Sequence, residues 1–148
     1  MKNSIRILGK SLILFTAIFA MASCDKNDDI DSIFRQETWY LTYIEDPESG
    51  GKVYANGKIY SIDFKTDKFT AVMPNGATIT GNWYADGGGS HSFFCRNLDK
   101  SGEVWRDDIA SKFFDILNNA DSYEGDTNWL QIITKDKNKY MQFGKKRQ

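Results

Sequence analysis

Apolar and polar residues alternate with a period of two along most of this 148-residue chain, and that period predicts β-strands. In the first expected strand, Trp39, Leu41 and Tyr43 should share one face, because successive side chains of a strand point to opposite sides. The expected strands are residues 38–45, 53–55, 58–64, 68–73, 77–84, 92–98, 121–123, 128–134 and 139–143. Short polar stretches separate most of them, which favours an antiparallel sheet.

Two glycine positions refine this picture. Asn56-Gly57 is a strong signal for a two-residue hairpin, because a type I′ turn needs positive φ at both positions. The sequence therefore predicts that the strands on either side of it pair with each other. Gly81 lies inside an expected strand, where a glycine indicates a bulge or a tight bend, as at the corner of a barrel.

One stretch follows a period of three to four residues, which predicts a helix. Its apolar positions are Trp105, Ile109, Phe113, Ile116, Leu117 and Ala120. Asp107 and Asp108 near its start complement the helix dipole, and Asn118-Asn119 can end it. The whole pattern predicts a mainly β fold (α+β): a single antiparallel β-sheet or partly open barrel of about 7–8 strands with one late α-helix packed on it. Ile33 and Phe34 are expected to pack over one end.

The first 23 residues have the features of a secretory leader. Lys2, Arg6 and Lys10 supply positive charge ahead of or beside the apolar run 12–22, and residues 1–23 contain no acidic side chain. The apolar run is too short for a transmembrane helix, which needs about 20 residues.

The leader closes on Met21-Ala22-Ser23-Cys24, which resembles the lipobox of bacterial lipoproteins. The resemblance implies that residues 1–23 are a lipoprotein signal peptide and that Cys24 is lipidated and becomes the mature N-terminus. Two or three acyl chains, at about 0.8 kcal/mol per buried methylene, make such an attachment to the membrane effectively permanent. The alternatives are an ordinary secretory signal with an incidental cysteine and a short anchor that stays uncleaved.

Residues 24–33 are expected to form an acidic, flexible tether, because they offer little that a core can bury. The charged residues next to Cys24 are Asp25, Lys26, Asp28 and Asp29. They resemble the surface-export signal of Bacteroides-type lipoproteins, which implies an outer-membrane lipoprotein exposed at the cell surface. The alternatives are a domain that faces the periplasm, retention in the inner membrane by an Asp directly after the cysteine, and a plain tether.

Removal of the leader leaves 125 residues, which suits one domain, expected over 34–144 and followed by a basic tail, 145–148. This mature chain carries 16 basic and 20 acidic side chains with no basic face in the pattern, so nucleic acid is not an expected partner. Four Trp, seven Tyr and eight Phe favour a well-packed β-rich domain, which is expected to be monomeric.

Several short motifs follow one another in a characteristic order. They are Thr38-Trp39-Tyr40-Leu41, Tyr60–Phe64, Ile79–Trp83, Phe113–Leu117, Tyr123–Asp126, Trp129–Ile132 and Tyr140–Phe143. This order resembles the META/HslJ-like family of bacterial envelope lipoproteins, which implies a β-domain in the envelope and no particular reaction. The Gly-Cys-Asn motif of that family is missing, since Gly81-Asn82-Trp83 stands in its place, so a role tied to that cysteine does not carry over.

His91 and Cys95 are the candidate base and nucleophile of a thiol enzyme. They lie four residues apart without an orienting carboxylate, and together they supply two of the four ligands of a structural zinc site. Asp121–Asp126 lacks the oxygen spacing of a calcium loop. No catalytic residue, metal or cofactor is therefore expected. With Cys24 lipidated, Cys95 has no disulfide partner and is expected to be a buried, inert thiol, although thiol chemistry there stays open.

Trp83-Tyr84 and Phe93-Phe94 are consecutive aromatic pairs within expected strands. If the sheet has one buried face, one ring of each pair must lie outside the core. Exposed rings suit a sugar face, a peptide or a partner protein. Trp83, Tyr84, Phe93 and Phe94 are therefore a candidate ligand or partner surface, and the alternative is a sheet covered on both sides.

Three functions remain open at this point. The first is a lipid-anchored, non-catalytic envelope module that binds an envelope protein or supports the cell surface. The second is a lipocalin-like binding module for a glycan or small apolar ligand, since Thr38-Trp39 is loosely similar to the Gly-x-Trp start of lipocalins. The third is a thiol enzyme acting through Cys95. An enclosed apolar cavity would favour the second over the first.

Overall fold

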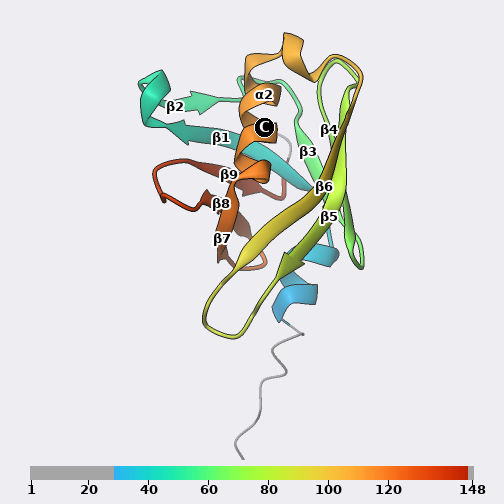
Figure 1. Ribbon diagram of the computed structural model, residues 1–148, viewed down its shortest axis with the longest axis vertical. Helices are drawn as coiled ribbons and strands as arrows, with labels where there is room; N and C mark the ends of the chain where they lie inside the picture. The colour runs from blue at the N-terminus through green and yellow to red at the C-terminus, as the bar shows by residue number, and fades with distance from the viewer. Residues whose placement is uncertain (1–28, 147–148) are drawn as a thin grey trace, which may run out of the picture.

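The computed structural model describes residues 29–146, which form one antiparallel β-sheet curled into a nearly closed barrel (Figure 1). The strands are β1 (Trp39–Asp46), β2 (Gly51–Tyr54), β3 (Ser61–Phe64), β4 (Lys68–Val72), β5 (Thr78–Ala85), β6 (Phe93–Ser101), β7 (Ala120–Gly125), β8 (Trp129–Thr134) and β9 (Tyr140–Gly144). The helical segments are η1 (Asp31–Arg35), η2 (Pro47–Ser49), η3 (Val104–Arg106) and α2 (Asp108–Asn118). The mainly β fold with one late helix is confirmed.

The sheet runs in the order β6-β5-β4-β3-β1-β9-β8-β7, and β2 pairs with β1. The two end strands approach each other where Ser92 bridges Ser122 and the Tyr123 N–H donates to the His91 carbonyl oxygen (2.9 Å). α2 connects these end strands along the chain and packs against both β6 and β8 (Figure 1). The helix therefore lies over the part of the barrel that ladder hydrogen bonds leave open.

Phe34 in η1 plugs one end of the barrel. Its side chain is fully buried, and its ring packs against four others at centroid distances of 5.0–5.6 Å. The four rings belong to Phe64, Trp83, Phe93 and Tyr123. The expectation that Ile33 and Phe34 pack over one end of the fold is confirmed for Phe34, and Ile33 packs beside it against the core.

The ordered fold starts before the expected boundary at residue 34. Ile30 is buried, and η1 begins at Asp31, so residues 29–33 belong to the fold and not to a free tether. The leader and four predicted positions lie outside the described residues: Cys24, Asp25, Lys26 and Asp28. Within the described range, 29–146, the helices are all too short or too polar to cross a membrane.

α2 begins where Asp107 caps it. One carboxylate oxygen of Asp107 accepts hydrogen bonds from the backbone N–H groups of Ile109 and Ala110 (2.9 and 3.2 Å), and the other accepts from the buried Tyr60 hydroxyl (2.7 Å). The buried stripe of the helix is Ala110, Phe113, Ile116 and Leu117. The expectation that Trp105 belongs to this stripe is wrong: it lies in η3, before the cap, and is 70% exposed.

A β-bulge at Thr42 divides β1 into two parts. The pairing of β1 with β9 shifts between Leu41 and Tyr43, so Thr42 is an extra residue on β1. Trp39 and Leu41 point into the core as expected, whereas Tyr43 turns outward to contact other tyrosines. The prediction that Tyr43 shares their face is wrong, because one inserted residue reverses every later side chain of a strand.

The Asn56-Gly57 turn has the expected conformation but not the expected partners. Asn56 and Gly57 have φ values of 51° and 77°, and the Lys58 N–H donates to the Ala55 carbonyl oxygen (3.0 Å). However, β2 and β3 do not pair with each other: both pair with β1, one after the other along the same edge. The turn therefore connects two strands that pair one after the other with the same edge of β1, because β1 is long enough to pair with both.

Gly81 marks the expected bulge. The register between β5 and β6 shifts at this position, and Asn97 on β6 takes a left-handed conformation with φ 52°. A Cβ at Gly81 would lie 2.9 Å from the Arg96 carbonyl oxygen and 2.9 Å from the Phe69 ring. Only glycine therefore lets the strands approach this closely.

Candidate functional site

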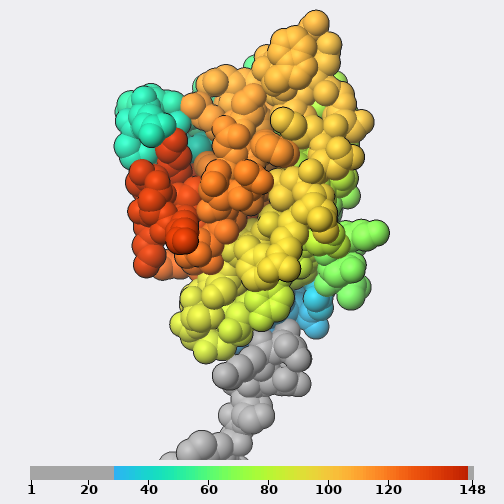
Figure 2. Space-filling model, viewed as in Figure 1, coloured from blue at the N-terminus to red at the C-terminus, as the bar shows by residue number. Residues whose placement is uncertain are grey.

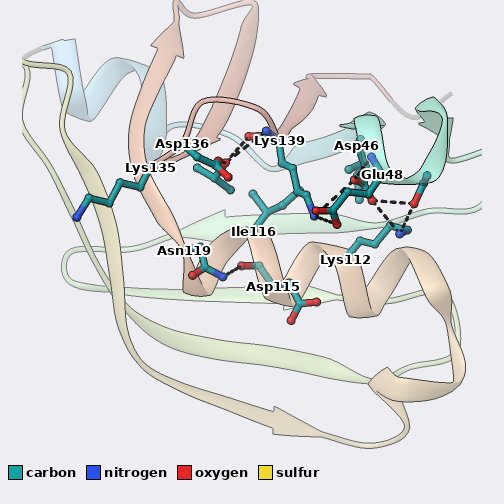
Figure 3. Close-up of a pocket in the computed structure, with 12 residues that line it drawn as sticks. Asp46, Glu48, Lys112, Asp115, Ile116, Asn119, Lys135, Asp136 and Lys139 are labelled. Atoms are coloured by element: carbon teal, nitrogen blue, oxygen red, sulfur yellow. Dashed lines mark hydrogen bonds and ion pairs between the residues drawn. The ribbon is translucent and has the colours of Figure 1, made fainter.

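A cleft of about 610 Å³ opens on the surface where the β1–η2 junction, α2 and the β8–β9 turn meet. In Figure 2 these segments are the cyan, orange and red groups that border one another on the left of the molecule. Ile44 and Ile116 line the cleft with apolar surface, and most of the other lining side chains are charged or polar. The close-up in Figure 3 shows those charged side chains.

Asp46 lies at the centre of the polar network and is only 4% exposed. One carboxylate oxygen accepts hydrogen bonds from the Lys112 ammonium (2.9 Å) and the Ser49 hydroxyl (2.8 Å). The other accepts from the Glu48 backbone N–H (3.1 Å) and lies 3.5 Å from the Lys139 ammonium. Two lysines, one from α2 and one beside β9, thus converge on a carboxylate at the end of β1 (Figure 3).

The surroundings of Asp46 fix its charge. Burial alone would raise the pKa of the carboxyl group, but the hydrogen bonds from Lys112 and Ser49 outweigh it. The positive charges of Lys112 and Lys139 act in the same direction, and together these contacts lower the pKa of Asp46 to about 2. The carboxylate is therefore ionised at every physiological pH.

Lys139 is held in its charged form by similar contacts. Its ammonium donates a hydrogen bond to Glu48 (2.6 Å), and this bond raises the pKa of Lys139 despite an opposing contribution from burial. The negative charge of Asp46 raises it further. On the same side of the cleft, a hydrogen bond from the Thr134 hydroxyl (2.6 Å) lowers the pKa of Asp136. The ion pairs therefore stabilise one fixed charge state.

The turn from β1 into η2, which carries Asp46, is stabilised by residues that are close along the chain. Asp46 caps η2 through the Glu48 N–H, and Pro47 suits the first position of a helix, where its missing N–H is not needed. Gly50 ends η2 in a left-handed conformation with φ 86°. The same carboxylate thus shapes a turn and pairs with two lysines from distant parts of the chain.

This geometry favours binding over proton transfer. A general acid or base works best with a pKa near the working pH, and neither Asp46 nor Lys139 meets that condition. Among residues 29–146, no group of three or more His, Cys, Asp and Glu side chains is placed to hold a metal ion. The cleft offers fixed charges of both signs beside apolar surface.

His91 and Cys95 lie in different surroundings. His91 is exposed, and its ring stacks on that of Tyr123 at a centroid distance of 5.1 Å. Cys95 packs against the core, and burial raises the pKa of its thiol to about 12. The thiolate is the reactive form of cysteine, so little of this partly buried thiol is in its reactive form at neutral pH.

We expect slow labelling of Cys95 by a maleimide in the native protein and fast labelling after denaturation, because burial raises the pKa of the thiol and so suppresses the thiolate. The Cys24→Ser chain suits the measurement, since Cys95 is then its single thiol. Comparable labelling rates before and after denaturation would show that the thiol is reactive in the folded state.

The two aromatic pairs divide between the core and the outer surface. Trp83 and Phe93 are 8% and 0% exposed and belong to the core, so neither can form part of a ligand surface. Tyr84 is 51% exposed, and its ring stacks on that of Phe94 at 5.0 Å. The Arg96 guanidinium lies 4.8 Å from the Phe94 ring centroid. The candidate surface is thus reduced to Tyr84 and Phe94, on the outside of β5 and β6.

Sequence reasoning missed the residues of the cleft. The expected strand 38–45 ends just before Asp46-Pro47-Glu48-Ser49, and no role was predicted for Lys112. An Asp directly before Pro-Glu-Ser is a signal for a capped turn, which could have been found. The meeting of this turn with Lys112 and Lys139 depends on the closure of the barrel, and local spacing carries no signal for it.

Comparison with solved structures supports the barrel. A crystal structure of a DUF4847 family protein from Bacteroides vulgatus ATCC 8482 is 24% identical in sequence, with a TM-score of 0.63. The match covers 80% of this chain and 99% of that chain. At this identity it shows the fold alone. No curated protein matches the sequence.

The expected membership of the META/HslJ-like family is wrong. The family model that matches residues 25–145 describes a domain of unknown function, DUF4847. Motifs such as Trp39-Tyr40-Leu41 and Tyr140–Phe143 report the alternation that any antiparallel barrel needs, so they do not separate one barrel family from another. The chain belongs to the DUF4847 family, whose function is unknown.

Proposed function

We propose that this protein is a lipid-anchored, non-catalytic lipoprotein of the cell envelope that acts as an interaction module at the outer membrane. The observation that carries the non-catalytic part is the fixed charge state of the cleft, where Asp46 is paired with two lysines and has a pKa of about 2. The raised pKa of the Cys95 thiol supports the same interpretation. A hydrolase activity of the folded protein that disappears in His91→Ala or Cys95→Ala would contradict it.

The anchor rests on the sequence that precedes the barrel. Residues 12–22 are apolar, and Cys24 follows two small residues. The family model begins at residue 25, directly after that cysteine. Ile30 and Phe34 are already buried in the barrel, so the described chain enters the fold at the plugged end.

The packed interior supports a surface-binding module over the lipocalin-like alternative. A lipocalin-like site needs an internal cavity, whereas the inside of this barrel holds fully buried large side chains. They include Phe34, Trp39, Phe64, Phe69, Phe93, Phe113 and Phe143. A ligand inside the barrel would have to displace them, so we place the interaction on the outside.

The test of the anchor is the replacement Cys24→Ser. We expect the wild-type protein in the membrane fraction and the variant either soluble or unprocessed, because the serine hydroxyl cannot be acylated in place of the thiol. The barrel should stay folded in both, since the described fold starts at residue 29. An unprocessed variant would be larger than the wild type by the length of the leader. If the variant still sediments with membranes after a carbonate wash and has the same size as the wild type, the apolar run 12–22 holds both there and the lipoprotein assignment fails.

A second variant, with Asp25, Asp28 and Asp29 all replaced by alanine, tests the side of the membrane. We expect this variant to be lipidated normally but to lose sensitivity to protease added outside intact cells. Equal protection of wild type and variant would mean that the protein faces the periplasm.

A further inference from the structure

One outer face of the barrel, formed by β2, β1, β9 and β8, carries five aromatic side chains that we call the aromatic face. They are Tyr40, Tyr43, Tyr54, Trp129 and Tyr140. The burial pattern places them outside: on β9, Met141 and Phe143 are fully buried, whereas the residues between and beside them are not. Tyr54 and Trp129 are 49% and 37% exposed. The Thr42 bulge is what brings Tyr43 onto this face.

The tyrosines of the aromatic face hold one another in place. The ring of Tyr43 lies 5.6 Å from that of Tyr54 and 6.0 Å from that of Tyr140, measured between centroids. The hydroxyl groups of Tyr43 and Tyr140 share a hydrogen bond (3.4 Å), and the Lys52 ammonium lies 4.6 Å from the centre of the Tyr43 ring. Rings fixed in this way lose little further freedom when a ligand binds.

Gly144 leaves an open position in the same face. It is paired with Tyr40 on one side and with Trp129 on the other, so the two aromatic side chains rise about 10 Å apart across two strand spacings. A Cβ at Gly144 would meet only the Thr42 hydroxyl oxygen, at 3.7 Å. The barrel itself therefore has no steric need for glycine here, and the open position provides room for a ligand.

The polar groups of the face are mostly neutral. Gln131 and Gln142 lie side by side on β8 and β9, with a hydrogen bond of 2.8 Å between their amides. Lys52 and Glu45 occupy opposite positions on β2 and β1, so their charges balance. Among the outward residues of these four described strands, Ile133 is the aliphatic one. Nucleic acid would require a basic surface, and a membrane would require aliphatic and basic side chains.

We propose that the aromatic face binds a neutral glycan, laid flat across the strands from Tyr54 to Trp129. Sugar rings combine an apolar C–H face with a rim of hydroxyl groups, which matches tyrosine and tryptophan rings beside glutamine amides. The proposal rests on the binding role proposed above and names its ligand. It does not depend on the Asp46 cleft.

The test is depletion of the full-length acylated protein, in a sugar-free non-ionic detergent, by suspensions of insoluble β-glucan, β-mannan and β-xylan. We expect at least one of them to bind the wild type. Tyr43→Ala should bind about tenfold more weakly, because it removes the central ring. Gly144→Val should bind at least as weakly with an unchanged melting temperature, because its side chain fills the open position.

Trp105→Ala is the matched control, since Trp105 is an exposed aromatic residue that belongs to η3 and not to the four strands of this face, and its binding should equal that of the wild type. Failure of all three polysaccharides to deplete the wild type would overturn the proposal. The proposal would also be overturned if both Tyr43→Ala and Gly144→Val bound the polysaccharide as strongly as the wild type does. Loss of the wild-type protein's binding in high salt would overturn it too, because a neutral glycan is not held by charge. Membrane fractionation tests the lipid anchor separately, so a failure of glycan binding would not change the conclusion about the anchor.

Discussion

Replacing Phe34 with alanine should lower the free energy of unfolding by about 4 kcal/mol, the largest effect that we expect from a single substitution. The side chain is fully buried among four aromatic rings, so its loss removes apolar contacts and leaves a cavity at the plugged end of the barrel. For a domain of this size the melting temperature should fall by roughly 15 °C. Thermal and urea denaturation followed by circular dichroism would measure both.

Phe94→Ala is the matched control, because Phe94 is also a phenylalanine but lies on the outer surface of β6, against Tyr84. It should cost about 1 kcal/mol. If Phe34→Ala costs no more than Phe94→Ala, then η1 is not part of the cooperative unit, and the fold begins at β1 instead.

Asp46→Asn should lower the free energy of unfolding by about 2.5 kcal/mol at pH 7, which is the value of a carboxyl pKa lowered from 3.8 to about 2. Because the pKa is lower in the folded protein, the stabilisation is present above the unfolded pKa. It is lost as the pH falls from about 4 through about 2. The difference between wild type and variant should therefore shrink over that interval, as urea denaturation at several pH values would measure.

Asp115→Asn is the control for this titration, since Asp115 lines the same cleft from α2 but is exposed. Its stability should follow that of the wild type across the pH range. A difference between wild type and Asp46→Asn that stays constant from pH 7 to pH 2 would mean that the ion pairs with Lys112 and Lys139 contribute nothing.

The local elements of this fold could be predicted from sequence because each depends on residues that are close along the chain. Alternation located the strands, and the charges of Asp107 and Asp108 indicated a helix start close to them, although the cap at Asp107 itself was not predicted. The positive φ values of Asn56 and Gly57 were also predictable, because that requirement is local. The strand pairing on either side of the turn could not be predicted, because β2 and β3 both pair with β1 and not with each other, and this depends on how the barrel closes.

The candidate sites were less accessible to sequence reasoning. A single extra residue, Thr42, reverses the second half of β1 and decides that Asp46 is buried and that Tyr43 is outside. Threonine is common in β-strands, so the residue type at position 42 does not indicate a bulge. For the two aromatic pairs, the prediction that one ring of each lies outside the core is correct, because Tyr84 and Phe94 lie where the alternation of β5 and β6 is regular.

The position of β1 has a consequence for how the chain reaches its native state. β1 is the first strand along the chain, yet it lies between β3 and β9, and Tyr40 pairs with Gly144 at the far end of the sequence. If the chain is exported N-terminus first, as the proposed function requires, β1 must stay unpaired on one edge until the last strand has crossed. Such long-range pairing slows folding and exposes a strand edge meanwhile. Under that proposal, the barrel should be complete only after translocation ends, when β9 pairs with β1.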